Sequence, residues 1–149
     1  MSEDTAQRLR NDLQYYAEKN LLIATKAGGR PIPLVLNKAQ AYIHSRLEDQ
    51  RKRTGKVRAI ILKGRQQGCS TLIGARFYHK TVTIPGLLTF IFAHDSAASE
   101  SLFNMVQNYY DGSNEAFRPT LGTRNNKELL FPVLRSGYKV GTAGTKGLG

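Results

Sequence analysis

Apolar and polar positions along the chain follow two kinds of pattern, one with helical spacing and one of short, nearly continuous apolar runs. From Asp4 to about Ala24 an apolar side chain recurs every three or four residues, which predicts an amphipathic helix capped by Asp4. The glycines and prolines of residues 27–33 end that helix. We therefore expect an N-terminal helical appendage over residues 1–30 and a main domain over residues 31–149.

Two further stretches have helical spacing. The first runs from Lys38 to about Gln50, and Asn37 directly before it is a favourable N-cap. The second is capped by Asp95 or Ser96, both favourable N-caps, and runs to about Tyr110. Each stretch gathers its apolar side chains on one face, so each is predicted to pack against a core.

Short apolar runs predict strands. Val57–Leu62 and Leu87–Ala93 have the character of buried parallel strands, and a helical apolar run beginning at Leu72 lies between them. Such a strand–helix–strand unit is expected to be right-handed. Residues 127–132 and 138–143 predict a second pair of strands, joined near residues 135–137. The expected fold class is α/β.

The loop after the Val57–Leu62 strand carries the candidate chemistry. Its sequence is Lys63-Gly64-Arg65-Gln66-Gln67-Gly68-Cys69-Ser70-Thr71. Strand, glycine loop, hydroxyl residue and helix is the layout of a phosphate-binding loop, in which backbone N–H groups and the helix dipole attract an anion. The alternative is a glycine turn with solvated Lys63 and Arg65 side chains.

The loop departs from the usual pattern G-x-x-x-x-G-K-[ST] at two positions. If Gly68 is the second glycine, Ser70 takes the Mg²⁺-binding hydroxyl position and Cys69 replaces the lysine. Lys63 occupies the first glycine position, from which it could reach a β- or γ-phosphate. Arg65 adds a second cationic donor.

Gln40 lies upstream of this loop, on the predicted Lys38–Gln50 helix. Its amide offers a donor and an acceptor together, which suits contact with the edge of an adenine ring. An exposed helix glutamine without a ligand is the alternative.

Composition adds an argument from charge. The chain has 22 Lys and Arg against 11 Asp and Glu, a formal net charge of +11, which favours a polyanionic partner, nucleic acid before an anionic membrane. No apolar run approaches the ~20 residues that a membrane span needs. A single cysteine suits a reducing cytoplasm. The basic run of residues 50–56 favours a solvated loop over a DNA contact.

The order and spacing of these features resemble the N-terminal ATPase half of phage terminase large subunits, from about Leu34 to Gly149. The resemblance rests on the loop Arg65-Gln66-Gln67-Gly68-Cys69-Ser70-Thr71, on Gln40, on the strand end His94-Asp95 and on Thr142-Ala143-Gly144-Thr145. It implies an ASCE-type P-loop NTPase fold, a three-layer sandwich that is incomplete here, and ATP-driven pumping of double-stranded DNA into a procapsid.

The resemblance also implies roles for individual residues. Gln40 would contact adenine, Arg65 would be the catalytic candidate, and Ser70 (or Thr71) would ligate Mg²⁺. The ATP phosphates would lie against Lys63, Gly64, Arg65, Gln66, Gln67, Gly68, Cys69, Ser70 and Thr71. The implied partners are double-stranded DNA, the portal protein and the small terminase subunit, with a homo-oligomer, no membrane, and a place in the bacterial host cytoplasm and transiently at the procapsid portal vertex.

One part of the family pattern does not occur in this sequence. No apolar strand ends in the paired acidic residues of a Walker B motif, and the C-terminal nuclease domain is absent. We therefore expect a truncated motor protein that binds nucleotide without hydrolysing it efficiently. Two alternatives stay open: another P-loop nucleic-acid motor of the helicase-like kind, and a small basic DNA-binding protein without nucleotide chemistry.

Overall fold

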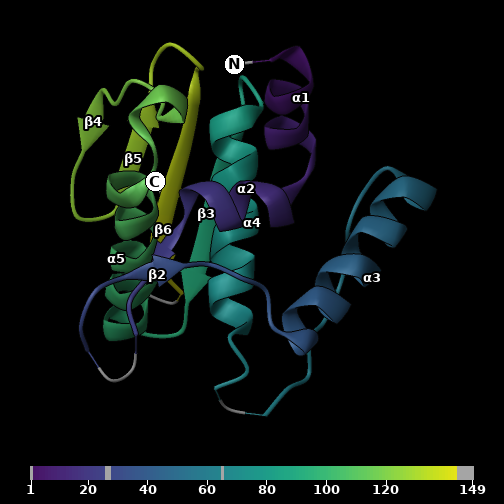
Figure 1. Cartoon of the computed structure of the whole chain (residues 1–149). Coiled ribbons are helices and arrows are strands. Elements are labelled where there is room, and N and C mark those ends of the chain that lie inside the picture. Colours follow the sequence, from purple (N-terminus) through teal and green to yellow (C-terminus); the bar gives the residue numbers. More distant parts are fainter. Residues whose placement is uncertain (1, 26–27, 65, 144–149) are drawn as a thin grey trace.

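The computed structural model describes residues 2–25, 28–64 and 66–143 of the 149-residue chain (Figure 1). Helices and strands are mixed along it, which confirms the α/β class. In chain order the elements are α1 (Glu3–Asn11), α2 (Leu13–Asn20), β1 (Leu22–Ile23), β2 (Ile32–Pro33), α3 (Lys38–Thr54), α4 (Cys69–Thr83), β3 (Leu88–Ala93), α5 (Ser96–Gly112), the 3₁₀ helix η1 (Glu115–Phe117), β4 (Thr123–Arg124), β5 (Glu128–Phe131) and β6 (Ser136–Thr142).

The main sheet has the strand order β3-β6-β5-β4. β3 and β6 pair in parallel, from Leu88 opposite Gly137 to Ala93 opposite Thr142, while β6 with β5 and β5 with β4 are antiparallel. The strand predicted over residues 87–93 and the pair predicted over residues 127–132 and 138–143 are confirmed. Local apolar runs and turn residues were sufficient for these predictions because the strands are separated by clear breaks.

Helices cover one face of this sheet. On β3, Thr89 and Ala93 are buried, whereas Leu88, Phe90 and Phe92 on the opposite face are each more than half exposed. Alternation of this kind is expected of a strand with one solvated face. The described residues therefore form two layers, helices on a sheet, and not the three that the P-loop class has.

The strand predicted over Val57–Leu62 is wrong. These residues form no strand, and Ile60 and Leu62 are fully exposed. The main chain of Arg58 bonds instead to the side chain of Gln50, which donates to its carbonyl oxygen at 3.0 Å and accepts from its N–H at 2.8 Å. Strands are stabilised by cross-strand neighbours, and a single-sequence pattern does not show whether a neighbour exists. The expected strand–helix–strand unit is therefore not formed.

Helices α1 and α2 pack into the same core as the rest of the described chain. Leu9, Leu13, Tyr16 and Leu21 belong to one buried cluster with Leu72 of α4 and with residues of α5, β5 and β6. Residues on both sides of the boundary predicted between residues 30 and 31 thus share one core. β1 also pairs with β2 across that boundary, with Leu22 opposite Pro33.

The single helix predicted from Asp4 to Ala24 is two helices, α1 and α2. The break lies at Asp12, whose extended backbone ends α1 and whose side chain accepts a hydrogen bond from Tyr15 N–H at 3.0 Å to cap α2. An aspartate that bonds the backbone locally competes with helix continuation in this way. Ser2, not the predicted Asp4, is the N-cap of α1.

Candidate phosphate-binding site

The first turn of α4 presents backbone N–H groups without a capping side chain. Gly68 is its N-cap, in the left-handed conformation with φ +72°, and no side chain of the described residues accepts a hydrogen bond from the first N–H groups of the helix. The first bond of the helix is donated by Leu72 N–H to the Gly68 carbonyl oxygen at 3.0 Å. The N–H groups of Cys69, Ser70 and Thr71 precede that bond, so they are the orphan donors of the helix start and are suited to an anion.

Gln40, in the first turn of α3, holds this helix start in place. Its Nε2 donates to the Gly68 carbonyl oxygen at 2.8 Å, and its Oε1 accepts from Asn37 N–H at 2.9 Å. Asn37 Oδ1 accepts in turn from Gln40 N–H at 2.9 Å, which completes a capping box at the start of α3. The N-cap predicted at Asn37 is therefore confirmed, and Gln40 is 4% exposed.

The environment of Gln40 bears on its predicted role. Both polar groups of its side chain bond the main chain, and the contact with adenine that the resemblance implies stays a prediction without support from this geometry. The sequence did carry a signal for the observed role, because Asn37 and Gln40 have the spacing of a capping box. The contact with Gly68, across 28 positions, had no such signal.

The remaining loop residues surround the helix start. Lys63 and Ser70 are exposed and line one hollow of about 270 Å³, beside Ile73 and Ile91. Gly64, Gln66 and Gln67 are exposed, Thr71 is half-buried and Cys69 is buried. The structure thus places Lys63 and Ser70 on one hollow beside the uncapped turn. Arg65, and Gly144 and Thr145 of the resemblance, lie outside the described residues.

The donor set for a metal ion at this loop is small. Among the described residues no group of three or more His, Cys, Asp and Glu side chains could hold a metal ion. The exposed Ser70 hydroxyl is the protein ligand that the described part of the loop offers. A magnesium ion would fit here with phosphate oxygens as its other ligands, because Mg²⁺ is commonly bound by few protein groups together with substrate phosphates.

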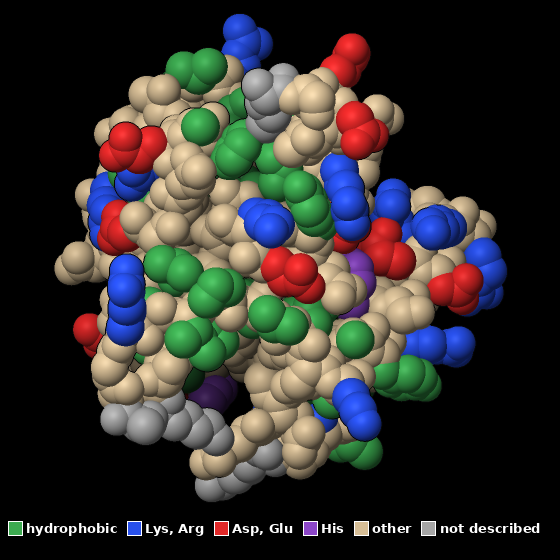
Figure 2. Space-filling model, in the orientation of Figure 1, with side chains coloured by type: hydrophobic (Ala, Val, Ile, Leu, Met, Phe, Trp, Pro, Cys, Tyr) green, Lys and Arg blue, Asp and Glu red, His purple; other side chains and the backbone are tan. Residues whose placement is uncertain are grey.

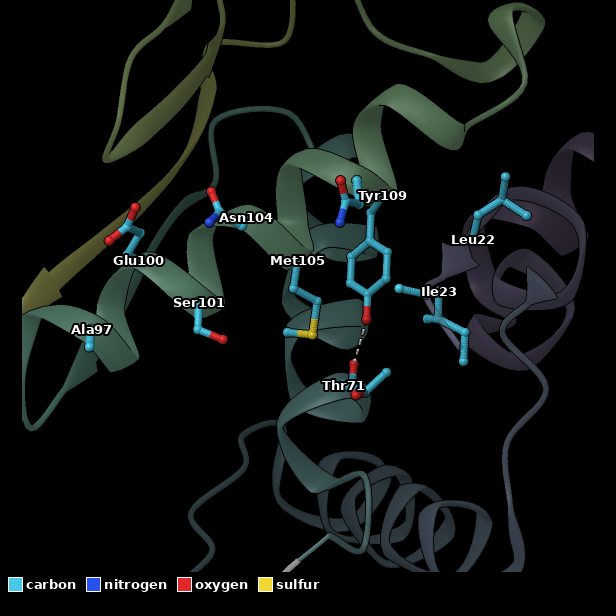
Figure 3. Close-up of a pocket in the computed structure, with 11 residues that line it drawn as sticks. Leu22, Ile23, Thr71, Ala97, Glu100, Ser101, Asn104, Met105 and Tyr109 are labelled. Atoms are coloured by element: carbon cyan, nitrogen blue, oxygen red, sulfur yellow. Dashed lines mark hydrogen bonds between the residues drawn. The ribbon is translucent and has the colours of Figure 1, made fainter. Parts of the chain in front are cut away.

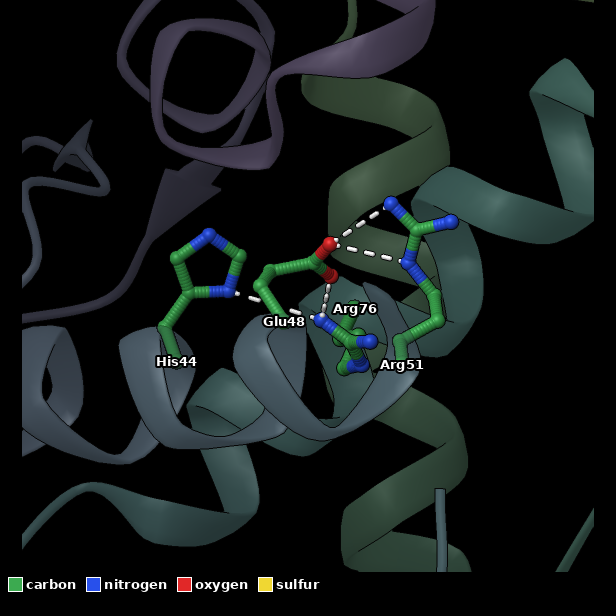
Figure 4. A network of polar contacts seen from close by, with 4 residues as sticks. All are labelled: His44, Glu48, Arg51 and Arg76. Atoms are coloured by element: carbon green, nitrogen blue, oxygen red, sulfur yellow. Dashed lines mark hydrogen bonds and ion pairs between the residues drawn. The ribbon is translucent and has the colours of Figure 1, made fainter. Parts of the chain in front are cut away.

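A polar network joins α3 to α4 beside the loop (Figure 4). The buried Arg76 guanidinium donates to Glu48 Oε1 at 2.5 Å, and Arg51 approaches Glu48 Oε2 at 2.9 Å. Partial burial raises the pKa of Glu48, but the hydrogen bonds from Arg76 and Arg51 outweigh this and lower it to about 2. His44 Nδ1 lies 3.5 Å from Arg76. The network fixes α3, which projects from the body in Figure 1, against α4.

His79 is a second buried polar residue of α4. Its Nε2 donates to the Leu9 carbonyl oxygen at 2.8 Å, and its ring lies 4.6 Å from that of Tyr16. Burial lowers the pKa of His79 to about 4, against the hydrogen bond to Leu9, which raises it. The imidazole is therefore neutral at pH 7 and holds α1 against α4, away from the loop chemistry.

The exposed surface is basic around the far end of α3. Figure 2 shows Lys and Arg side chains around this protruding helix, and the sequence places Lys52, Lys56 and Arg58 there, all exposed. Neither protein-family models nor curated protein sequences match this chain. In the part of the chain that the structure describes, no helix combines the length and apolar character that a membrane span requires.

Proposed function

We propose that residues 63–71 bind the polyphosphate of ATP, and that the chain is the nucleotide-binding part of a terminase-type DNA-packaging ATPase. The observation that carries the proposal is the uncapped first turn of α4, which Gly68 begins in a left-handed conformation. A helix start of this kind gathers N–H donors and the positive end of the helix dipole at one point.

Two side chains support an anion at that point. Lys63 and Ser70 line the same hollow next to the turn. A charge-assisted hydrogen bond from Lys63 would stabilise a terminal phosphate, and the Ser70 hydroxyl would hold Mg²⁺. When bound, the ion neutralises phosphate charge.

The wider assignment comes from the resemblance and the charge. An ASCE-type P-loop fold, pumping of double-stranded DNA, contact with the portal protein and the small terminase subunit, and homo-oligomerisation are proposed for the complete protein. The net charge of +11 supports a nucleic-acid partner. A helicase-like P-loop motor would share the loop and the charge, and DNA-packaging activity of the complete protein separates the two.

A second candidate function has its own observation. The exposed Lys52, Lys56 and Arg58 at the far end of α3 would contact the phosphates of DNA without any nucleotide chemistry. In that case the protein would be a small basic DNA-binding module, and nucleotide would compete only by charge.

Calorimetric titration with MgATP and with inorganic tripolyphosphate tests the proposal. Lys63→Ala and Ser70→Ala are compared with Lys56→Ala, which removes an exposed lysine outside the loop. We expect Lys63→Ala to raise the Kd for both ligands about tenfold, as the loss of one charge-assisted bond would. Lys56→Ala is expected to change either Kd less than about twofold. Equal losses for the two lysines, or no binding by the wild type, would overturn the phosphate site.

A further inference from the structure

A hollow of about 490 Å³ lies between α5 and β1, next to the first turn of α4 (Figure 3). Leu22 and Ile23 of β1 line it together with residues of α5 and with Thr71 of α4. No residue of the loop before Gly68 lines it. The hollow is therefore separate from the space around Lys63.

Both apolar and polar side chains line the hollow. Leu22, Ile23 and the side chain of Met105 supply apolar surface, while Asn104 and Asn108 supply carboxamides. Asn104 and Asn108 are four residues apart on α5, so they lie one above the other on the same helix face. Both are exposed, and neither has a hydrogen-bond partner within the described part of the chain.

The position of the hollow is fixed relative to the phosphate-binding turn. Tyr109, on the wall of the hollow, donates its hydroxyl to the Thr71 carbonyl oxygen at 3.1 Å (Figure 3). A Cβ atom on Gly74 would lie only 2.6 Å from Met105 Cε, so this glycine allows α4 and α5 to approach closely. A ligand in the hollow would thus lie against the same turn whose N–H groups are proposed to hold phosphate.

We infer that this hollow receives the purine base of the bound nucleotide, with Asn104 and Asn108 contacting its polar edge. The inference rests on the proposed phosphate site. A purine is a flat ring with apolar faces and an edge of alternating donors and acceptors, and an apolar wall with two free carboxamides matches both features. Asparagine is a common partner of adenine for this reason.

The charge of the residues that line the hollow agrees with a base inside it and phosphates outside it. The Glu100 carboxylate lines the hollow and is exposed, so the anionic phosphates are disfavoured there and a neutral base is not. An adenine amino group would donate a hydrogen bond to such a carboxylate. Base recognition would then come from α5, and Gln40 would remain a structural residue of the phosphate turn.

The test compares ATP with inorganic tripolyphosphate in titrations of the wild type, Asn104→Leu/Asn108→Leu and Gln107→Leu. Gln107 is the matched control, since it lies on α5 but does not line this hollow. We expect ATP to bind the wild type about tenfold more tightly than tripolyphosphate, the factor of one good bidentate contact. The double variant is expected to lose that advantage and to bind tripolyphosphate unchanged, while Gln107→Leu keeps it.

Asn108→Asp serves as a second variant, because it keeps the side-chain shape and removes the amide donor. A several-fold weaker ATP affinity with unchanged tripolyphosphate affinity supports the inference. Equal affinity of the wild type for ATP and tripolyphosphate, or an ATP affinity that neither variant changes, overturns the base site and leaves the phosphate site standing. Failure of both ligands to bind the wild type overturns the phosphate site and this inference together.

Discussion

The side chain of Gln40 and the main chain of Gly68 are joined by a hydrogen bond of 2.8 Å, although the two residues are 28 positions apart. This bond connects the first turn of α3 to the N-cap of α4. Gln40 is itself fixed by the capping box with Asn37. The end of the proposed phosphate loop is therefore held in place by the protein itself, which is the preorganisation that tight anion binding needs.

Gln40→Glu should destabilise the fold by about 2 kcal/mol, because it removes a buried donor and places a carboxylate against the Gly68 carbonyl oxygen. Gln50→Glu is the matched control: Gln50 also donates to a main-chain carbonyl, that of Arg58, but in an exposed position. We expect it to cost less than about 1 kcal/mol. Urea denaturation measures both, and equal costs would show that the Gln40 bond has no special role.

Gly68→Ala should cost more than Gly55→Ala. Both glycines have φ near +70°, so both substitutions carry the left-handed penalty of about 1 kcal/mol. A Cβ atom at Gly68 would in addition lie 2.6 Å from Gln40 Nε2, whereas nothing lies within 4 Å of one at Gly55. The excess cost for Gly68, and weaker tripolyphosphate binding in that variant alone, are the expected results. Matching stability curves for the two variants would contradict the contact.

Acid should destabilise the protein first through His79. Its pKa falls from 6.5 to about 4 on folding, so the unfolded chain binds more protons between these values and stability is lost as the pH falls from 6.5 to 4. The full loss is up to about 3 kcal/mol. His79→Gln should flatten this part of the pH profile. If the denaturation midpoint of the variant depended on pH between 6.5 and 4 as steeply as that of the wild type, a buried neutral imidazole at His79 would be contradicted.

Glu48 should affect the stability of the fold at lower pH than His79 does. Its folded pKa of about 2 lies below the ordinary value of 4.5, so its ion pairs stabilise the fold above pH 4.5 and are lost as the pH falls toward 2. Glu48→Gln should therefore flatten the profile below pH 4.5. If Glu48→Gln changed the pH dependence of stability only between pH 4.5 and 6.5, the contacts of Glu48 with Arg76 and Arg51 would be contradicted.

The strand predicted over Val57–Leu62, which the structure does not form, can be tested by substitution. Ile60→Thr/Leu62→Thr should change the free energy of unfolding by less than about 0.5 kcal/mol per residue, because both side chains are fully exposed. Leu72→Ala, at a fully buried position of α4, should cost about 2–5 kcal/mol. A cost for the double variant as large as that of Leu72→Ala would place the segment in a packed sheet after all.

Local signals predicted much of the fold. The caps at Asn37 and Asp95 and the apolar faces that follow them gave α3 and α5, and the breaks around β3, β5 and β6 gave three strands. The prediction was wrong for Val57–Leu62, where an apolar run has no sheet neighbour. It was also wrong at Asp12, where a side chain that bonds the backbone divides one expected helix into two.

The candidate site was predictable in part. Glycine spacing and hydroxyl residues located the loop, because the geometry of a helix start depends on adjacent residues. The contacts that hold the loop in place join distant positions, Gln40 with Gly68 and Glu48 with Arg76. A single sequence contains no record of such pairs. Arg76 within an apolar helical run was the sole local sign of the second contact.

Amide chemical shifts test the phosphate site most directly, since they report each N–H group separately. Titration of tripolyphosphate into the ¹⁵N-labelled protein should shift the resonances of Cys69, Ser70 and Thr71 first, with a common Kd, and leave Lys52, Lys56 and Arg58 nearly unchanged. Shifts that instead concentrate on those three basic residues, with none at the first turn of α4, would contradict the site and favour a simple DNA-binding surface.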